Sequence, residues 1–443
     1  MFFKTYNTEI HISIFDYFYV FLCVIFLGSA TVFTYGSLEN FGFGVNAGFE
    51  SVIGKFLMLI LSIVLLNRYH IGIAKCFNLK ICAVILLWGI LQAFKYKQFS
   101  TYPFVRIFNL YFASVLVFCY GEKLIFVLED VIVKLAKIDV VMWLVMLIMP
   151  EFIDILMSLS PIKGSGLIEG NSWVVFASGW QYEIVKRNIG FAWEPGRFGS
   201  IISIAVFFNL VIHKFNIRHN PNFWWLTVAL LSTQSTTAYL GYLVVLVAYL
   251  YNKKKKYFLK MLPLITCAFF ILMSLDFMAD KINDLSIFNE EHNERWTEEM
   301  TYYATKDGFM VPQRFDGLLF EGLNILHDPI LGNATDPYTY LYGLFNIKFS
   351  LSNGVLRIFA NMGVFMGILY YILCIQSSVW MSRIYKYKGT MWFLIMFIVI
   401  NFSYSWIFEP IFLSFILYPY IAEKQGLFSF KPSFSHSYLK TNL

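Results

Sequence analysis

The densest group of side chains suited to chemistry surrounds Glu194. Arg187 precedes this carboxylate and Arg197 follows it, at the start of an apolar run. An arginine presents a planar fork of donors that matches phosphate oxygens, and a carboxylate can accept the proton of a sugar hydroxyl. The group therefore predicts a site that removes a hydroxyl proton and stabilises an anionic leaving group. A simpler interpretation has equal weight, because Pro195 suits a helix start and Glu194 would favour that helix's positive N-terminus.

Motifs of several other enzyme classes are missing from the sequence. It has no GxxxxGK[ST], HExxH or GxSxG motif and no Asp-x-Asp pair, which are marks of ATP hydrolysis, zinc proteolysis, serine hydrolysis and sugar-nucleotide transfer. Of the seven histidines, His292 and His327 fall in the segments assigned below to the outside, so an all-histidine metal site is not expected there. The sequence predicts no metal and no cofactor.

Composition places these residues in a membrane protein. Of 443 residues, 58% are hydrophobic and 14% are charged, and the mean hydropathy is +0.63. A bilayer core about 30 Å thick needs roughly 20 apolar residues per crossing, and such runs follow one another along most of the chain. The basic residues form short clusters between these runs, which is typical of membrane orientation. Nucleic-acid binding is therefore excluded in spite of the formal charge of +6.

We expect an all-α polytopic membrane protein with about 12 transmembrane helices and a cytoplasmic N-terminus, since this arrangement keeps the basic loops inside. Residues 222–251 are expected to form two short helices that meet at Ser232 to Thr237, and residues 124–137 a helix on the cytoplasmic surface. The apolar runs lie at 14–34, 51–67, 80–95, 103–119, 138–157, 197–213, 222–235, 237–251, 257–275, 354–377, 390–408 and 410–423.

Two long outside segments divide the chain. A small helical outside domain is expected between the ninth and tenth spans, because a structureless loop of its length would be unusual. It carries thirteen acidic and five basic residues. The predicted parts are 1–275 with helices 1–9 and an outside loop at about 158–196, 276–353 as the large outside (periplasmic) domain, 354–423 with helices 10–12, and 424–443 as a cytoplasmic tail.

Arginine is enriched where the positive-inside rule predicts few positive charges. In this topology 17 of 25 lysines lie inside, whereas six of nine arginines lie in the outer half of the protein. Such a set predicts a phosphate or pyrophosphate site at the outer mouth. The alternative is that each arginine reaches outer headgroups or pairs with a local acid. The six are Arg106, Arg187, Arg197, Arg295, Arg314 and Arg357.

Three stretches resemble one protein family. The run R-N-I-G-F-A-W-E-P-G-R-F-G, which begins at Arg187, resembles the motif of the middle outside loop of O-antigen and capsular polysaccharide polymerases (the Wzy type) and of related O-antigen ligases. The stretch from Arg314 through D-P-I-L-G-N at 328–333 to Ser352-Asn353-Gly354 and N-M-G-V-F-M-G at 361–367 resembles their large outside loop and its re-entry into the membrane. The corner at 231–235 resembles their short helix pair.

Two departures from the family pattern matter. The ligases usually carry a His-Asn pair before the re-entering helix, whereas this chain has Ser352-Asn353, which favours a polymerase. The polymerases are often described with a glycine eleven residues after an arginine in both outside loops. Here Arg187 is followed at that distance by Phe198, and Arg314 by Ile325. The arginines match and the spacing does not.

The resemblance implies a membrane glycosyltransferase that joins repeat units carried on undecaprenyl pyrophosphate, at the periplasmic face of a bacterial inner membrane. The implied partners are the lipid-linked oligosaccharide, membrane lipids and a separate chain-length regulator. Alternatives are an O-antigen ligase that transfers the glycan to lipid A core, a flippase or transporter of the lipid-linked unit, and a transferase that uses a polyprenyl-monophosphate sugar. The implied roles are Arg187 and Arg314 on pyrophosphate, Arg197, Arg357 and Asn353 as further substrate-binding residues, and Glu194 as the base.

Overall fold

Helices make up most of the part of the chain that the computed structural model describes, as composition predicts. The candidate site residues fall within this part, with Arg314 described by its backbone alone. The described residues are 12–27, 36–37, 47–99, 102–160, 162–164, 171–178, 187–192, 194–253, 263, 309–310, 312, 314–333, 339–349, 351 and 353–424.

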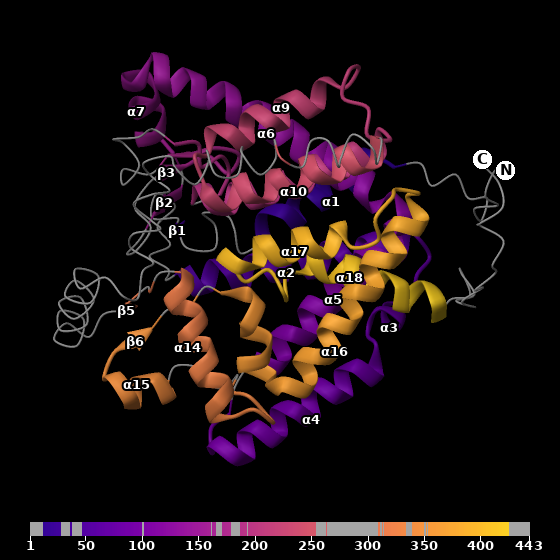
Figure 1. The fold of residues 1–443 in the computed structure, drawn as a ribbon, viewed down its shortest axis with the longest axis vertical. Coiled ribbons are helices and arrows are strands. Elements are labelled where there is room, and N and C mark those ends of the chain that lie inside the picture. The colour runs from indigo at the N-terminus through magenta and orange to yellow at the C-terminus, as the bar shows by residue number, and fades with distance from the viewer. Residues whose placement is uncertain are drawn as a thin grey trace.

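The helices form a bundle in which α6, α9 and α10 lie along one side and α4 along the other (Figure 1). Among the closest packed pairs are α5 with α18, α8 with α10, and α10 with α17. The helices are α1 Ile14–Phe26, α2 Ala47–Arg68, α3 Ile73–Cys76, α4 Leu79–Tyr96, α5 Tyr102–Tyr120, the 3-10 turn η3 Gly121–Lys123, α6 Leu124–Ile148, α7 Pro150–Ser158, α8 Pro195–Ile212, α9 Pro221–Ser232, α10 Thr236–Lys253, α14 Arg314–His327, α15 Thr339–Phe345, α16 Gly354–Ile384, α17 Trp392–Ser403 and α18 Pro410–Lys424.

Three of the described helices, α4, α8 and α16, are long and apolar enough to cross a membrane. Shorter apolar helices accompany them in α1, α17 and the first part of α18. This supports a membrane protein, while the count of twelve spans stays a prediction. The predicted span at 257–275 lies outside the described residues, and so does most of the predicted outside domain at 276–353.

Aromatic rings fill the core where α8, α17 and α18 meet. The ring of Phe208 on α8 lies 5.0 Å, centroid to centroid, from that of Phe415 on α18. Phe393 on α17 lies 6.0 Å from the same ring of Phe415. All three side chains are buried, and aromatic pairs at these separations add to the stabilisation from buried area. This packing fixes α8 against the C-terminal helices.

Two small sheets join segments that are far apart in sequence. In the first sheet the order is β1-β2-β3-β4 and all pairs are antiparallel. Its pair of Gly36 with Gly164 joins the outside loop expected after the first span to the outside loop expected at about 158–196, so the structure places these two loops on the same side of the bundle, as the predicted topology requires. The strands are β1 Gly36–Ser37, β2 Ile162–Gly164, β3 Asn171–Ser172, β4 Ala177–Ser178, and the parallel pair β5 Phe309–Met310 and β6 Lys348–Phe349.

Helix α6 differs from expectation. Residues 124–137 were expected to form a surface helix, but α6 continues without a break to Ile148, and its side chains on several faces up to Val140 are buried in the core. The charged positions that suggested a surface helix have polar partners instead. Glu129 accepts a hydrogen bond of 2.7 Å from Asn209, and Lys137 donates one of 3.0 Å to Asn222. Buried polar groups satisfied in this way produce the same sequence pattern as a solvated face.

The predicted helix pair at 222–251 is confirmed. Helix α9 ends at Ser232 and α10 begins at Thr236. The turn between them contains Gln234 with a positive φ of 47°. We refer to residues 232–236 as the α9–α10 corner.

Helix α16 is broken at Gly363, where φ is 79° and ψ is 167°. A segment that we call the latch loop, Asp328 to Asn333, supplies the partners that the break needs. The Val364 amide donates to Pro329 O at 2.7 Å, and the Asn333 amide donates to Ala360 O at 2.8 Å. A break inside an apolar helix requires such internal partners, because lipid offers none.

Helix α4 binds the latch loop from the other side. Gln92 donates to Leu331 O and to Asn361 O, both at 2.8 Å, and Trp88 Nε1 donates to Leu331 O at 2.9 Å. Lys95 Nζ lies 2.8 Å from a carboxylate oxygen of Asp328. The latch loop thereby joins α4, the end of α14 and the break in α16.

The Gly363→Ala substitution tests the latch. This backbone conformation is open mainly to glycine, and a Cβ at this position would collide with Ile330 O. We expect a loss of about 1–3 kcal/mol of stability, measured as thermal unfolding of the detergent-solubilised protein. Gly322→Ala on α14 is the control, because a Cβ there meets nothing within 4 Å. Equal stability of the two variants would contradict the interpretation.

The pH dependence of stability tests the Asp328 contacts. Burial by itself would raise the pKa of Asp328, but hydrogen bonds from Lys95, Tyr96 and the Leu331 amide outweigh burial and lower it. A carboxylate with a lowered folded-state pKa stabilises the fold above the unfolded value of about 4, and this contribution is lost as pH falls through the folded-state pKa.

We therefore expect Asp328→Asn to unfold at a lower temperature than wild type at pH 7, and the difference to shrink below pH 4. Thermal unfolding between pH 3 and pH 7 measures this. Asp130→Asn, which removes the surface ion pair with Lys134, is the control and should differ little from wild type. A constant difference between Asp328→Asn and wild type at every pH would count against the argument.

Candidate functional site

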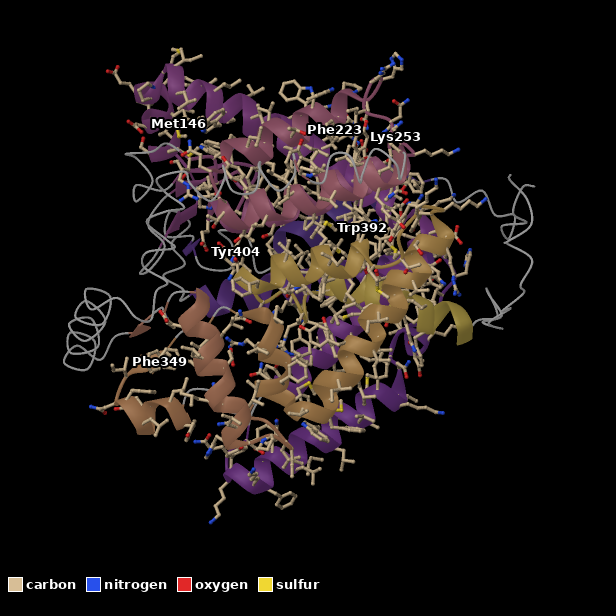
Figure 2. The ribbon with its side chains drawn as sticks, viewed as in Figure 1. Met146, Phe223, Lys253, Phe349, Trp392 and Tyr404 are labelled. Carbon is tan, nitrogen blue, oxygen red and sulfur yellow. The ribbon has the colours of Figure 1, made fainter. Side chains whose placement is uncertain are left out.

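Glu194 and Pro195 begin α8, as their sequence predicts. Glu194 occupies the N-cap position with extended backbone angles (φ −146°, ψ 137°), and Pro195 is the first helical residue. The Glu194 carboxylate, however, makes no side-chain cap hydrogen bond. Its Oε1 accepts a hydrogen bond from the hydroxyl of Tyr404, which follows the end of α17 (Figure 2). The carboxylate therefore lies at the positive N-terminus of α8, as the simpler interpretation has it, but its hydrogen bond goes to Tyr404 rather than to a backbone amide of the helix.

Arg197 joins the same group. Its guanidinium carbon lies 5.1 Å from the centroid of the Tyr404 ring, a cation–π contact. Tyr404 is 4% exposed, whereas Glu194 and Arg197 are both half-buried. One tyrosine thus holds a carboxylate through its hydroxyl and an arginine through its ring. We call Glu194, Arg197 and Tyr404 the α8 cluster.

The N-termini of three helices meet the segment Phe402 to Ser405. Asn353, at the N-cap of α16, donates to Phe402 O at 3.0 Å. Thr237, at the start of α10, shares a short hydrogen bond with Ser403. A Cβ on Gly354 would lie 2.7 Å from Tyr404 O, so the start of α16 approaches this segment closely. Helix N-termini carry partial positive charge, so their convergence favours anions at this place.

Arg187 binds the α9–α10 corner. Its Nε donates to Thr233 O at 3.0 Å and its Nη2 donates to Gln234 O at 2.7 Å. The neighbouring Asn188 donates through Nδ2 to Ser232 Oγ at 2.9 Å. A cation at the last carbonyls of a helix is favourable. In this structure the guanidinium of Arg187 therefore secures the corner, and its predicted role on pyrophosphate stays a prediction.

Arg357 and Asn353 lie together at the start of α16. Arg357 Nη1 is 3.6 Å from Glu321 Oε1 on α14 and also donates to Leu351 O. Asn353 Oδ1 accepts from the Val355 and Leu356 amides at 3.1 and 3.2 Å and so caps α16. Burial raises the pKa of Glu321, and the nearby Arg357 offsets this only in part. These contacts fix α14 on α16.

Arg314 is the first residue of α14. One turn later, a Cβ on Gly317 would lie 3.9 Å from the Cβ of Asn353. The backbone therefore brings the start of α14 beside the start of α16, which contacts the segment Phe402 to Ser405. The predicted site residues come from three separate stretches of sequence, and the structure gathers their helix starts at one end of the bundle.

Tyr404 was not predicted as a site residue from the sequence. It stands 210 residues after Glu194, in the expected span at 390–408, and belongs to no recognised motif. A weak signal is the polar interruption Ser-Tyr-Ser that begins at Ser403 in this apolar run. Trp193, which lies between the predicted site residues, is outside the described part of the chain.

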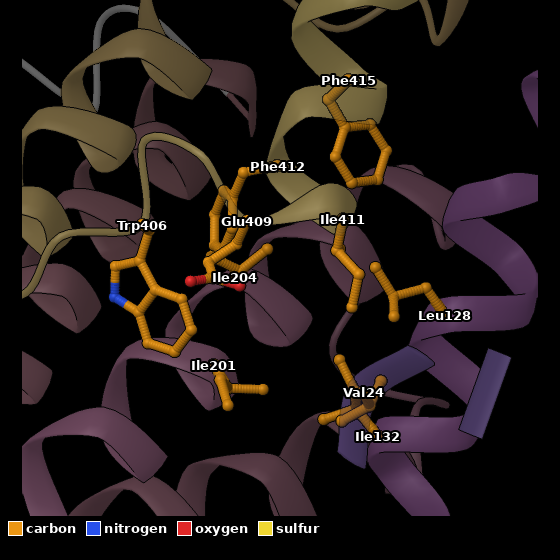
Figure 3. A pocket seen from close by; sticks show the side chains of 10 residues that line it. All are labelled: Val24, Leu128, Ile132, Ile201, Ile204, Trp406, Glu409, Ile411, Phe412 and Phe415. Atoms are coloured by element: carbon orange, nitrogen blue, oxygen red, sulfur yellow. The ribbon is translucent and has the colours of Figure 1, made fainter. Parts of the chain in front are cut away.

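An apolar pocket begins two residues beyond Tyr404. Figure 3 shows Trp406 and Glu409 at one side of it and Leu128 and Val24 at the other. Its walls come from α1, α6, α8 and α18. The pocket is lined by none of the three residues of the α8 cluster. The lining residues are Val24, Leu128, Ile132, Ile201, Ile204, Trp406, Glu409, Ile411, Phe412 and Phe415.

The described residues contain no group of three or more His, Cys, Asp or Glu side chains that could hold a metal ion. The five cysteines in the described part, Cys23, Cys76, Cys82, Cys119 and Cys374, are unpaired thiols. Comparison of the chain with protein-family models, curated proteins and solved structures found no match. The function is therefore inferred from the geometry of the site and from the motif resemblance.

A double-mutant cycle tests the Tyr404–Glu194 hydrogen bond. Tyr404→Phe removes the donor but keeps the ring beside Arg197, and Glu194→Gln removes the carboxylate charge. We expect a coupling of about 1 kcal/mol between the two changes in thermal unfolding experiments. The pair Tyr342→Phe and Glu194→Gln is the control, because Tyr342 is an exposed tyrosine on α15. Additive effects of Tyr404→Phe and Glu194→Gln would contradict a direct bond.

Proposed function

We propose that this chain is a polymerase that joins undecaprenyl-pyrophosphate-linked oligosaccharide repeat units into O-antigen or a related surface polysaccharide. The observation that carries the proposal is the α8 cluster, where a carboxylate and an arginine share one tyrosine beside three helix N-termini. A base and a concentration of positive potential are the two requirements of the reaction.

The proposed reaction transfers the growing glycan to the incoming unit. A hydroxyl oxygen of the incoming unit bonds to the anomeric carbon of the growing chain, and the bond from that carbon to pyrophosphate breaks. The hydroxyl proton passes to Glu194. The departing lipid pyrophosphate keeps the electron pair of the broken bond. Arg197 and the positive ends of α8 and α16 stabilise its negative charge.

The remaining predicted residues take supporting roles in this proposal. Arg187 holds the α9–α10 corner against the loop that precedes α8. Arg357 and Asn353 hold the start of α16 beside Tyr404. Arg314 keeps its proposed role on pyrophosphate, because its helix begins next to Asn353. The proposed base, Glu194, is held by the Tyr404 hydroxyl in a fixed orientation.

Two further observations favour a lipid-linked substrate and a polymerase. Three of the described helices, α4, α8 and α16, are long and apolar enough to cross a membrane, where a polyprenyl chain is soluble and a sugar nucleotide is not. The residue before the re-entering helix is Asn353, whose amide is fully buried and caps α16. The position of the ligases' acceptor-activating histidine is taken by Ser352, which has no imidazole to accept a proton. The proposed setting is the periplasmic face of a bacterial inner membrane, with a separate chain-length regulator as partner.

Surface glycan display tests the proposal. In a strain that lacks the protein, the glycan ladder on a gel should collapse to core plus one repeat, and wild type should restore it. Glu194→Gln should lower polymer yield by about 10²–10⁴-fold at a normal protein level in the membrane. Arg218→Ala, which removes an exposed arginine remote in sequence from the site, should restore the full ladder.

Other outcomes would decide against a polymerase. Complete loss of attached glycan in the deletion strain would indicate the ligase, or the flippase if lipid-linked units accumulated on the cytoplasmic face. An unchanged ladder would refute the polymerase, the ligase and the flippase alike. A full ladder with Glu194→Gln would leave the polymerase standing and remove Glu194 as its base.

A further inference from the structure

Arg106 is the only charged residue in α5. It lies slightly more than one turn into α5. Phe104 and Phe108, two positions to either side, are exposed by 46% and 43%. An ionisable side chain at such a place is costly and calls for a partner. Its surroundings therefore carry information about what it binds.

Two aromatic rings hold the guanidinium of Arg106. Its central carbon lies 4.1 Å from the ring centroid of Tyr102 on the same helix and 3.8 Å from that of Phe408, in the turn before α18. The two rings are 6.1 Å apart and nearly perpendicular. Stacking on ring faces orients a guanidinium but uses none of its N–H donors in hydrogen bonds. The rings thus fix the group in place and leave its donors for other acceptors.

The described part of the chain supplies no acceptor to these donors. Arg106 Nε is buried and has no hydrogen-bond partner there, and no described carboxylate forms an ion pair with Arg106. Arg187 and Arg357 differ in this respect, since their guanidinium groups donate to backbone carbonyls. A buried donor without an acceptor costs about 1–3 kcal/mol, more when it is charged. A ligand that provides an acceptor for Arg106 Nε would remove this free-energy cost.

Asn361 provides a second, independent sign of a ligand. It lies two residues before the break in α16, its side chain is 2% exposed, and its Nδ2 donates to the Tyr102 hydroxyl at 3.0 Å. Its Oδ1 is buried and accepts no hydrogen bond within the described residues. A charged donor and an amide acceptor are therefore both unsatisfied on either side of Tyr102. A ligand that carries an anion and a hydroxyl group would satisfy both.

We propose that Arg106, Tyr102, Phe408 and Asn361 form a binding site for the phosphate of a lipid headgroup. Phosphate oxygens accept from the guanidinium, and a headgroup hydroxyl donates to Asn361 Oδ1. The exposed Phe104 and Phe108 beside the arginine favour a lipid over a water-soluble phosphate, because they offer apolar surface to its chain.

The identity of the lipid rests on the proposed function. A polymerase must hold two lipid-linked units at once, and the α8 cluster accounts for one pyrophosphate. The segment that carries Tyr404 also carries Phe408, so one short turn would connect the two phosphate sites. The Arg106 site would then hold the pyrophosphate of the second unit. If the chain is not a polymerase, the same chemistry fits an anionic phospholipid.

Lipid binding by the full chain in phosphatidylcholine nanodiscs tests this site. The probe is a radiolabelled undecaprenyl-pyrophosphate-linked sugar, which carries both the anion and the hydroxyl group, and unlabelled phosphatidylglycerol in the nanodiscs is the competitor. We expect Arg106→Ala to weaken binding at least tenfold at one of two probe sites, since the α8 cluster binds the other. Arg106→Lys should bind with intermediate affinity, because lysine keeps the charge but lacks the planar fork. Arg218→Ala is the matched control and should bind as wild type.

The outcomes distinguish a site for the lipid-linked substrate, a site for a phospholipid and no site at Arg106. Probe binding that depends on Arg106 and resists phosphatidylglycerol assigns the site to the lipid-linked substrate. Binding that depends on Arg106 and is displaced by phosphatidylglycerol assigns it to a phospholipid, whatever the result of the glycan ladder. Equal binding by wild type, Arg106→Ala and Arg106→Lys overturns the proposal and leaves the polymerase unaffected. If Arg106→Ala does not fold, Arg106→Gln, which keeps length and loses charge, takes its place in the comparison.

Discussion

Peptide groups that lie in lipid must find their hydrogen-bond partners within the protein. The break in α16 at Gly363 leaves neighbouring peptide groups without partners in their own helix. The latch loop satisfies them by binding Ala360 O and the Val364 amide. The same loop ends α14, so meeting the needs of one helix also fixes the position of another. Arg357 and Glu321 then hold α14 along the first part of α16. The positions at which α14 and α16 begin depend on these contacts.

The α8 cluster depends indirectly on the contacts that hold α16 in place. Because α16 begins against the backbone of Tyr404 and Ser405, the turn after α17 is held by α16 as well as by α8. The hydroxyl of Tyr404 can then bind Glu194 while its ring faces Arg197. A carboxylate and a cation are kept close without forming the helix cap that the local sequence suggests. Orientation of this kind is what acid–base chemistry requires of its supporting residues.

Local sequence features predicted the local structure well. Within the described residues most apolar runs correspond to helices, although the run at 138–157 is divided between α6 and α7. Pro195 begins α8, and the polar corner after Ser232 separates α9 from α10. The contacts between distant segments were not predictable. Arg187 finds its partners 46 and 47 residues away, and Tyr404 lies 210 residues from Glu194. The burial of α6 was missed for a related reason, since Asn209 and Asn222 satisfy charges that a single sequence shows only as polar positions.

The latch loop also constrains how the protein can be assembled during synthesis. Trp88 and Gln92 on α4 donate to Leu331, which is 243 and 239 residues further along the chain. The ribosome delivers α4 long before that carbonyl exists, so these polar side chains enter the bilayer without their final acceptor. They can be satisfied in the interim by water or lipid headgroups near the membrane surface. Completion of the bundle therefore waits for a late step, in which the newly made loop before α16 replaces those temporary partners.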